Sequence, residues 1–204
     1  MYLKREFLIS VLLVVLAGFS FGKEIYFLGS SYTLDNLYPN DQYYDTSSLP
    51  AQTALMSTIG GFFDTFKGDE FGFLGSIAGG FGSHANFAGN SYSKNVFDEA
   101  YHIDVLIGAG YFKEIQKVYF VLGGGVGLVV ATLDFERSLN LPIFLSQGVG
   151  PGIYGGVGYS ITNRFSIFFN TKVIYTLIGV LPADIPFKPT LMVAPAFGIG
   201  IAMN

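Results

Sequence analysis

The feature that most constrains this chain is an alternation of bulky and small residues along glycine-rich segments. From Phe71 to Phe81 the odd positions carry Phe, Ile and Gly, whereas the even positions carry Gly, Leu, Ser and Ala. The same period of two runs through residues 101–111, 165–175 and 191–201. Successive side chains of a strand point to opposite faces, so the period predicts β-strands with one bulky and one small face.

Glycine also argues against membrane-spanning helices. The segment 118–131 is apolar, but it holds four glycines in 14 residues, and each costs a helix ~1 kcal/mol relative to alanine. Only 13% of the chain is charged, against ~25% in soluble domains. The combination favours strands that face lipid.

The first 22 residues have the layout of a secretory signal peptide. Lys4 and Arg5 precede an apolar run from Phe7 to Leu16, and small residues follow up to Gly22. An uncleaved anchor is the alternative, but the 16 residues from Phe7 to Gly22 fall short of the ~20 that a spanning helix needs. We therefore expect cleavage after residue 22 and one mature domain over residues 23–204.

Aromatic residues bound three of the alternating segments on the bulky face, each pair ten residues apart. These pairs are Phe71 with Phe81, Tyr101 with Tyr111, and Phe165 with Tyr175. Ten tilted strand residues rise ~25 Å along the membrane normal, which is the height of the apolar band of an outer-membrane barrel. The six residues are therefore predicted to form two aromatic girdles.

Eight segments of this kind can be paired along the chain. They are residues 25–34, 51–63, 70–82, 99–111, 118–133, 147–161, 165–177 and 190–203. The connections alternate between long and short, and the short ones are 64–69, 112–117 and 162–164. Because such barrels have short periplasmic turns and long outer loops, both termini are predicted to be periplasmic. The fold class is all-β, an eight-stranded antiparallel up-and-down transmembrane β-barrel.

In these features the chain resembles the small eight-stranded outer-membrane barrels of the OmpA, OmpX and OmpW type. The resemblance covers residues 24–204, and it is architectural. It implies an outer-membrane location, and lipid and the outer-membrane assembly machinery as partners. One departure is the end of the chain, Met203 and Asn204, where those barrels commonly end on an aromatic residue. A soluble lipocalin-like calyx is disfavoured, because the small face carries hardly any charge.

Two charged residues fall inside the predicted strand cores, both on the small face. Asp104 and Lys172 each lie three positions inside the outer aromatic residue of their strands. We expect them at one depth, as an ion pair or as a small network with His102 and Asn170. A buried charge is tolerable only when it is paired. The pair is interpreted either as a gate or as a structural plug of a closed interior.

The third and fourth long loops carry apolar residues where water is expected: Leu139, Leu141, Ile143, Phe144, Leu181, Ile185 and Phe187. Exposed apolar surface of that extent indicates a binding site or burial elsewhere. One interpretation is an apolar mouth for passive passage or binding of small apolar molecules in a narrow lumen, which the OmpW resemblance implies. The alternative is a surface adhesin or a structural barrel acting through its loops, with surface proteins as partners.

Catalysis is the least favoured hypothesis. His102, Asp104 and a loop serine such as Ser83 are the residue types of a hydrolytic set, which suits a lipid-modifying enzyme. No nucleophile elbow accompanies them. The chain is therefore predicted to be non-enzymatic, without metal or cofactor, because two histidines and no cysteine make a poor ligand set. Its net charge of −4 argues against nucleic acid.

Overall fold

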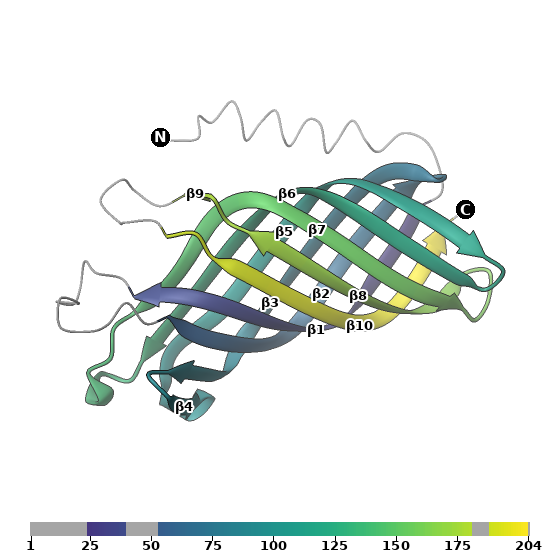
Figure 1. Cartoon of the computed structure of the whole chain (residues 1–204). Coiled ribbons are helices and arrows are strands. Elements are labelled where there is room, and N and C mark those ends of the chain that lie inside the picture. Colours follow the sequence, from purple (N-terminus) through teal and green to yellow (C-terminus); the bar gives the residue numbers. More distant parts are fainter. Residues whose placement is uncertain (1–23, 40–52, 181–187, 204) are drawn as a thin grey trace.

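The computed structural model describes residues 24–39, 53–180 and 188–203, and in these residues eight long strands form one antiparallel barrel (Figure 1). The predicted signal peptide lies outside the described residues. The long strands are β1 (Glu24–Pro39), β2 (Ala54–Gly68), β3 (Phe71–Phe87), β5 (Phe97–Ile115), β6 (Val118–Phe135), β7 (Phe144–Ser160), β8 (Phe165–Tyr175) and β10 (Leu191–Met203). Nowhere in this described part is there a helix with the length and hydropathy for a membrane span.

The barrel closes because the first and last strands pair with each other. Glu24 lies opposite Met203, and the register continues to Asp35 opposite Met192. Apart from a two-residue antiparallel pairing of β1 with β7 at Tyr38 and Pro39, every other pair of neighbouring long strands is consecutive and antiparallel. Closure leaves no sheet edge whose unpaired amides would face lipid. The predicted up-and-down barrel is confirmed.

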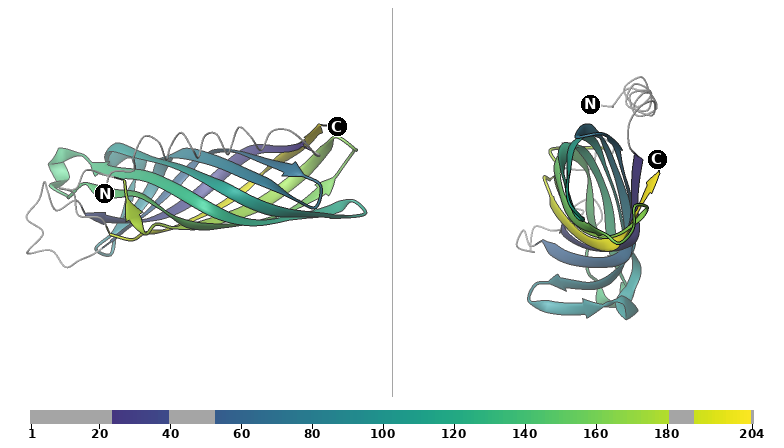
Figure 2. Two further views of the ribbon diagram at one scale, coloured as in Figure 1. Left: turned by 90° about the horizontal axis from the view of Figure 1, so that it is seen from above. Right: turned by 90° about the vertical axis from the view of Figure 1, so that its right-hand side faces the viewer.

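The three short connections lie at one end of the barrel with Glu24 and Met203, and we call this the turn end. It is the right-hand end in Figure 1. The connections are 69–70, 116–117 and 161–164. The opposite end, where 40–53, 88–96, 136–143 and 176–190 connect the strands, is the loop end. Figure 2 shows the elongated barrel from above and from the turn end.

The bulky face points outward, as the alternation predicts. Among the described residues, Phe71 and Phe81 are the most exposed large apolar side chains, at 77% and 79%. Across β3 and β5, Phe71 lies opposite Tyr111 at the turn end, and Phe81 lies opposite Tyr101 ten residues along. Phe165 and Tyr175 stand at the two ends of β8. Their role as membrane girdles stays a prediction.

The predicted strand ends were wrong at several places, because most strands are longer than expected. Residues 64–68 belong to β2 and residues 112–115 to β5, so the turns 69–70 and 116–117 hold only two residues each. At the loop end, β3 continues past Gly82 through a bulge at Ser83, after which the inward positions change from even to odd. A short strand β4 (Asn90–Ser93), two 3-10 turns and a two-residue strand β9 (Ile178–Gly179) complete this end.

Candidate functional site: the filled lumen

The centre of the lumen holds charged side chains that touch one another. Lys172 on β8 forms an ion pair with Asp104 on β5. His102, also on β5, lies with Nε2 2.8 Å from Asp104 Oδ2 and Nδ1 2.9 Å from Asp35 Oδ2 on β1. All four are at most 3% exposed, so each charge depends on its partners rather than on water.

Ser76 on β3 joins this group to a second one. Lys172 Nζ donates to Ser76 Oγ at 2.8 Å, and Ser76 lies directly opposite Asp64 in the register of β3 with β2. Asp64 Oδ2 also accepts from Tyr154 on β7 at 2.7 Å and from Asn170 on β8 at 2.6 Å. We call the eight residues the buried polar network: Asp35, Asp64, Ser76, His102, Asp104, Tyr154, Asn170 and Lys172.

The network crosses the whole lumen and carries more acid than base. It contains three carboxylates against one lysine and one histidine. Within the described residues, Asp64 Oδ1 and Asp35 Oδ1 are buried without a hydrogen-bond donor. Buried polar groups of this kind are costly unless they are satisfied. The network is therefore a strongly coupled set, in which one substitution affects several partners.

Below the network, toward the turn end, aromatic rings fill the barrel. Phe27 stacks on Phe168 with ring centroids 4.0 Å apart, and Tyr119 lies 5.8 Å from Phe168. Phe112 and Phe66 continue the stack at 5.5 and 5.6 Å. We call these five residues the aromatic column. Inward glycines make the space, because a Cβ at position 158 would fall 2.1 Å from the Tyr119 ring and one at 156 would fall 2.3 Å from the Phe168 ring.

Above the network, a second cluster of buried apolar residues fills the loop end. We call it the loop-end cluster, and it comprises Leu37, Ala54, Met56, Ala85, Phe87, Ala131, Leu133, Phe135 and Phe144. Phe135 makes edge contacts with Tyr92 at 4.9 Å and with Phe97 at 5.5 Å. The cluster connects the β3–β4 hairpin to the long ends of β5, β6 and β7.

The apolar residues that were predicted to form a loop mouth lie in several different environments in the structure. Phe144 is the first residue of β7 and is fully buried in the loop-end cluster, against which Leu141 packs. Ile143 is partly buried, and Leu139, in a 3-10 turn (Arg137–Leu139), is 38% exposed. Leu181, Ile185 and Phe187 lie outside the described residues.

The residues of the hydrolytic hypothesis are not brought together. Both ring nitrogens of His102 face carboxylates. Ser83 sits at the β3 bulge and donates to the Ser57 backbone oxygen at 3.1 Å. A base needs a hydroxyl within reach, and the described part of the chain offers His102 none. Nor does any group of three or more His, Cys, Asp and Glu side chains among the described residues have an arrangement that could hold a metal ion.

Sequence reasoning missed two of the three carboxylates. Asp35 follows the predicted end of the first strand, and Asp64 opened a predicted turn. Both obey the inward alternation of their strands, which continues through Thr33, Asp35 and Leu37 in β1. Extending each period past the polar residue would have found them. The statement that only two charges lie in the strand cores was therefore wrong.

No family model matches the chain, and the search of curated proteins finds no match. Solved structures do match. OprG from Pseudomonas aeruginosa has a TM-score of 0.58 and 14% identity, covering 90% of this chain and 96% of that one. Ail of Yersinia pestis has a TM-score of 0.53 and 13% identity, covering 90% and 100%. Neisserial surface protein A has a TM-score of 0.53 and 13% identity, covering 86% and 96%. The fold is that of the small outer-membrane barrels. At these identities the likeness concerns the fold alone.

Proposed function

We propose that this chain is a non-enzymatic outer-membrane protein with a sealed lumen, which acts through its loop end by binding a surface partner. The turn end then faces the periplasm and the loop end faces outward. The fold shared with OprG, described as an outer membrane protein, and with Ail, described as the attachment invasion locus protein, supports the outer-membrane location.

The observation that carries the proposal is the loop-end cluster. It lies around strand ends that continue beyond Phe81 and Tyr101, the expected outer girdle, and Phe87 and Phe135 within it are at most 5% exposed. This separate apolar core stabilises the strand ends that project beyond the expected outer girdle. It also fills the space that an open pore would need. A rigid projection presents loops in a fixed geometry, which favours recognition, because less ordering is needed on binding.

The test is to shorten the β3–β4 hairpin. Residues 88–96 are replaced by a two-residue turn in one variant, and the two-residue turn 116–117 at the turn end is replaced by Asn-Gly in the control. We expect the hairpin variant to bind host-cell or matrix surfaces less well while its heat-modifiable gel mobility stays intact. Equal attachment by both variants and by wild type would contradict the proposal.

Binding of small apolar molecules is the second candidate, and the same cluster favours it. Its lining includes Met56, whose flexible side chain adapts to irregular partners. Passage through the barrel would additionally require the Asp104–Lys172 pair to separate. Uptake of labelled apolar solutes into liposomes, compared with a control barrel, distinguishes this candidate, and uptake equal to that of the control removes it.

A further inference from the structure

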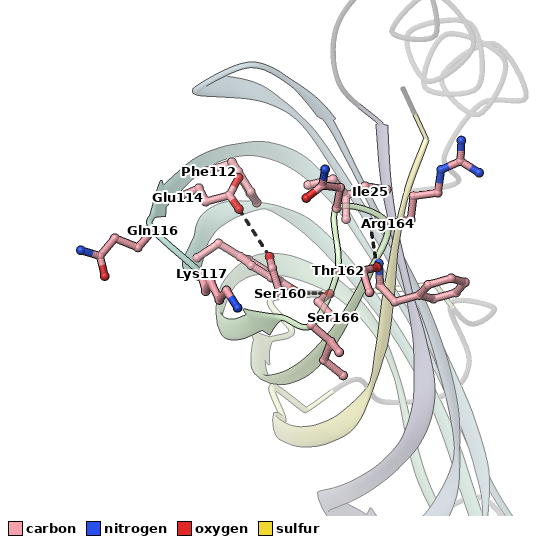
Figure 3. Close-up of a pocket in the computed structure, with 14 residues that line it drawn as sticks. Ile25, Phe112, Glu114, Gln116, Lys117, Ser160, Thr162, Arg164 and Ser166 are labelled. Atoms are coloured by element: carbon pink, nitrogen blue, oxygen red, sulfur yellow. Dashed lines mark hydrogen bonds between the residues drawn. The ribbon is translucent and has the colours of Figure 1, made fainter.

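The turn end contains a cavity of about 450 Å³ that plays no part in the proposed function. Residues of two short turns, 116–117 and 161–164, form its rim (Figure 3). Its apolar lining includes Ile25, Phe112 and Tyr119. The aromatic column continues behind Phe112 and Tyr119, so the cavity is closed toward the lumen. It has the form of a binding pocket, whose usual volume is roughly 300–1,000 Å³.

The polar lining combines hydroxyl groups with charged side chains. Ser166 Oγ lies 2.7 Å from the Tyr119 hydroxyl, and both residues are at most 7% exposed. Ser160 donates to Glu114 across the cavity wall at 3.4 Å. Thr162 accepts the backbone N–H groups of Arg164 and Phe165 at 3.2 and 3.0 Å, which fixes the 161–164 turn. The lining is therefore ordered. The Ser160 hydrogen is engaged by Glu114, whereas the Thr162 hydroxyl and one hydroxyl of the Tyr119–Ser166 pair still have a hydrogen to donate.

The basic residues at this end fall into two kinds. Lys67 pairs with Glu24 at 2.6 Å, and Lys113 pairs with Glu70 at 2.6 Å. Lys117 and Arg164, which line the cavity, have no side-chain ion pair with any described residue. In Figure 3 the Lys117 side chain runs toward the Ser160 side of the cavity, whereas that of Arg164 extends away from it. The formal charge of the lining is one positive from Lys117, Arg164 and Glu114 together, and Lys117 is the basic side chain directed into the cavity.

We propose that the turn-end cavity binds a small organic anion of about the size of a phosphorylated sugar. Lys117 supplies the charge for the anionic group, and the Thr162 hydroxyl and the remaining hydroxyl hydrogen of the Tyr119–Ser166 pair donate hydrogen bonds to it. The ring or carbon skeleton lies on the apolar floor made by Phe112 and Tyr119. The Glu114 carboxylate repels the anion, so it limits the affinity of the cavity for the ligand and disfavours a ligand with a second negative group near it.

The test is calorimetric titration of the full chain, folded in an uncharged detergent, with glucose 6-phosphate, glucose and inorganic phosphate. We expect glucose 6-phosphate to bind best, inorganic phosphate more weakly because it lacks contact with the floor, and glucose weakest. Binding should weaken with added salt, because the cavity opens to water. Equal binding of glucose and glucose 6-phosphate, or no binding of either at millimolar concentration, would overturn the proposal.

Three variants separate the site from general effects on the barrel. Lys117→Gln removes the unpaired charge and should weaken glucose 6-phosphate binding about tenfold. Lys113→Gln is the matched control, because that ammonium is already engaged by Glu70 outside the cavity, and it should bind like wild type. Glu114→Gln should bind more tightly, which damage to the fold would not produce. Equal weakening by the two lysine variants, or weaker binding by Glu114→Gln, would refute the assignment.

Discussion

The two ends of the lumen are filled by different kinds of packing. At the turn end the aromatic column stacks nearly parallel rings over inward glycines, with interplanar angles of 13° to 27°. At the loop end the rings meet edge to face, with angles of 65° to 79°. The column belongs to the regular barrel, whereas the loop-end cluster belongs to a wall with bulges and an added hairpin. One chain therefore combines a barrel of regularly repeating strands with an irregular loop end, whose packing depends on its own particular residues.

Removing one ring from each end gives the largest expected effects. Phe168 is 1% exposed in the column, and Phe135 is 2% exposed in the loop-end cluster. Phe168→Ala should lower the free energy of unfolding of the whole barrel by ~3 to 5 kcal/mol. Phe135→Ala should act mainly on its own end, because local units open separately.

Hydrogen exchange and urea unfolding in lipid vesicles distinguish the two variants. We expect Phe135→Ala to lose protection in residues 85–100 while the central strands keep theirs. If Phe135→Ala lowered protection evenly through all the strands, the two ends would form one cooperative unit and the comparison would fail.

Between the two ends, the buried polar network should show strong coupling. Asp104→Ala removes a partner carboxylate from the buried Lys172 and His102, and Lys172→Ala leaves Asp104 without its lysine partner. We expect the double variant to lose less stability than the sum of the two single variants, by about 0.5 to 3 kcal/mol. The measurement is a double-mutant cycle by urea unfolding, and full additivity would show that the pair makes no direct contribution.

Substituting inward and outward glycines of β7 should have a smaller effect, and it tests whether the aromatic column depends on inward glycines. A Cβ at Gly156 points inward, 2.3 Å from Phe168, whereas one at the neighbouring Gly155 meets only Leu122 at 3.7 Å. Gly156→Ala should destabilise the barrel by about 1 to 3 kcal/mol through overpacking, whereas Gly155→Ala should change its stability by less than about 0.5 kcal/mol. Thermal shift of gel mobility compares them, and equal shifts would mean that the column does not depend on inward glycines.

The sequence predicts the strands between the aromatic girdles well and the loop end poorly. Inside the girdles a period of two is sufficient, so the strands, their faces and the depth shared by Asp104 and Lys172 can be read from the residues. The bulge at Ser83 shifts the inward positions of β3 from even to odd numbers, and no residue type at that place predicts it. Phe144 was assigned to the apolar stretch of the third long loop, whereas in the structure its ring packs against Phe87 and Phe135.

The smallest expected effect concerns the exposed pair of Lys113 and Glu70 at the turn end. The hydrogen bond from Lys113 to Glu70 raises the pKa of the Lys113 ammonium above its usual value of 10.5. A raised pKa means that the folded barrel binds this proton more tightly than the unfolded chain, so the contribution is complete below pH 10.5 and is lost as the pH rises through the folded value. Glu70→Gln should lower the pKa of Lys113, as measured by NMR titration of its side chain, with little change in unfolding because both groups are solvated. An unchanged pKa in Glu70→Gln would mean that the pair is not formed in solution. Lys113 would then resemble Lys117, and the distinction between paired and unpaired cations at the turn end would no longer hold.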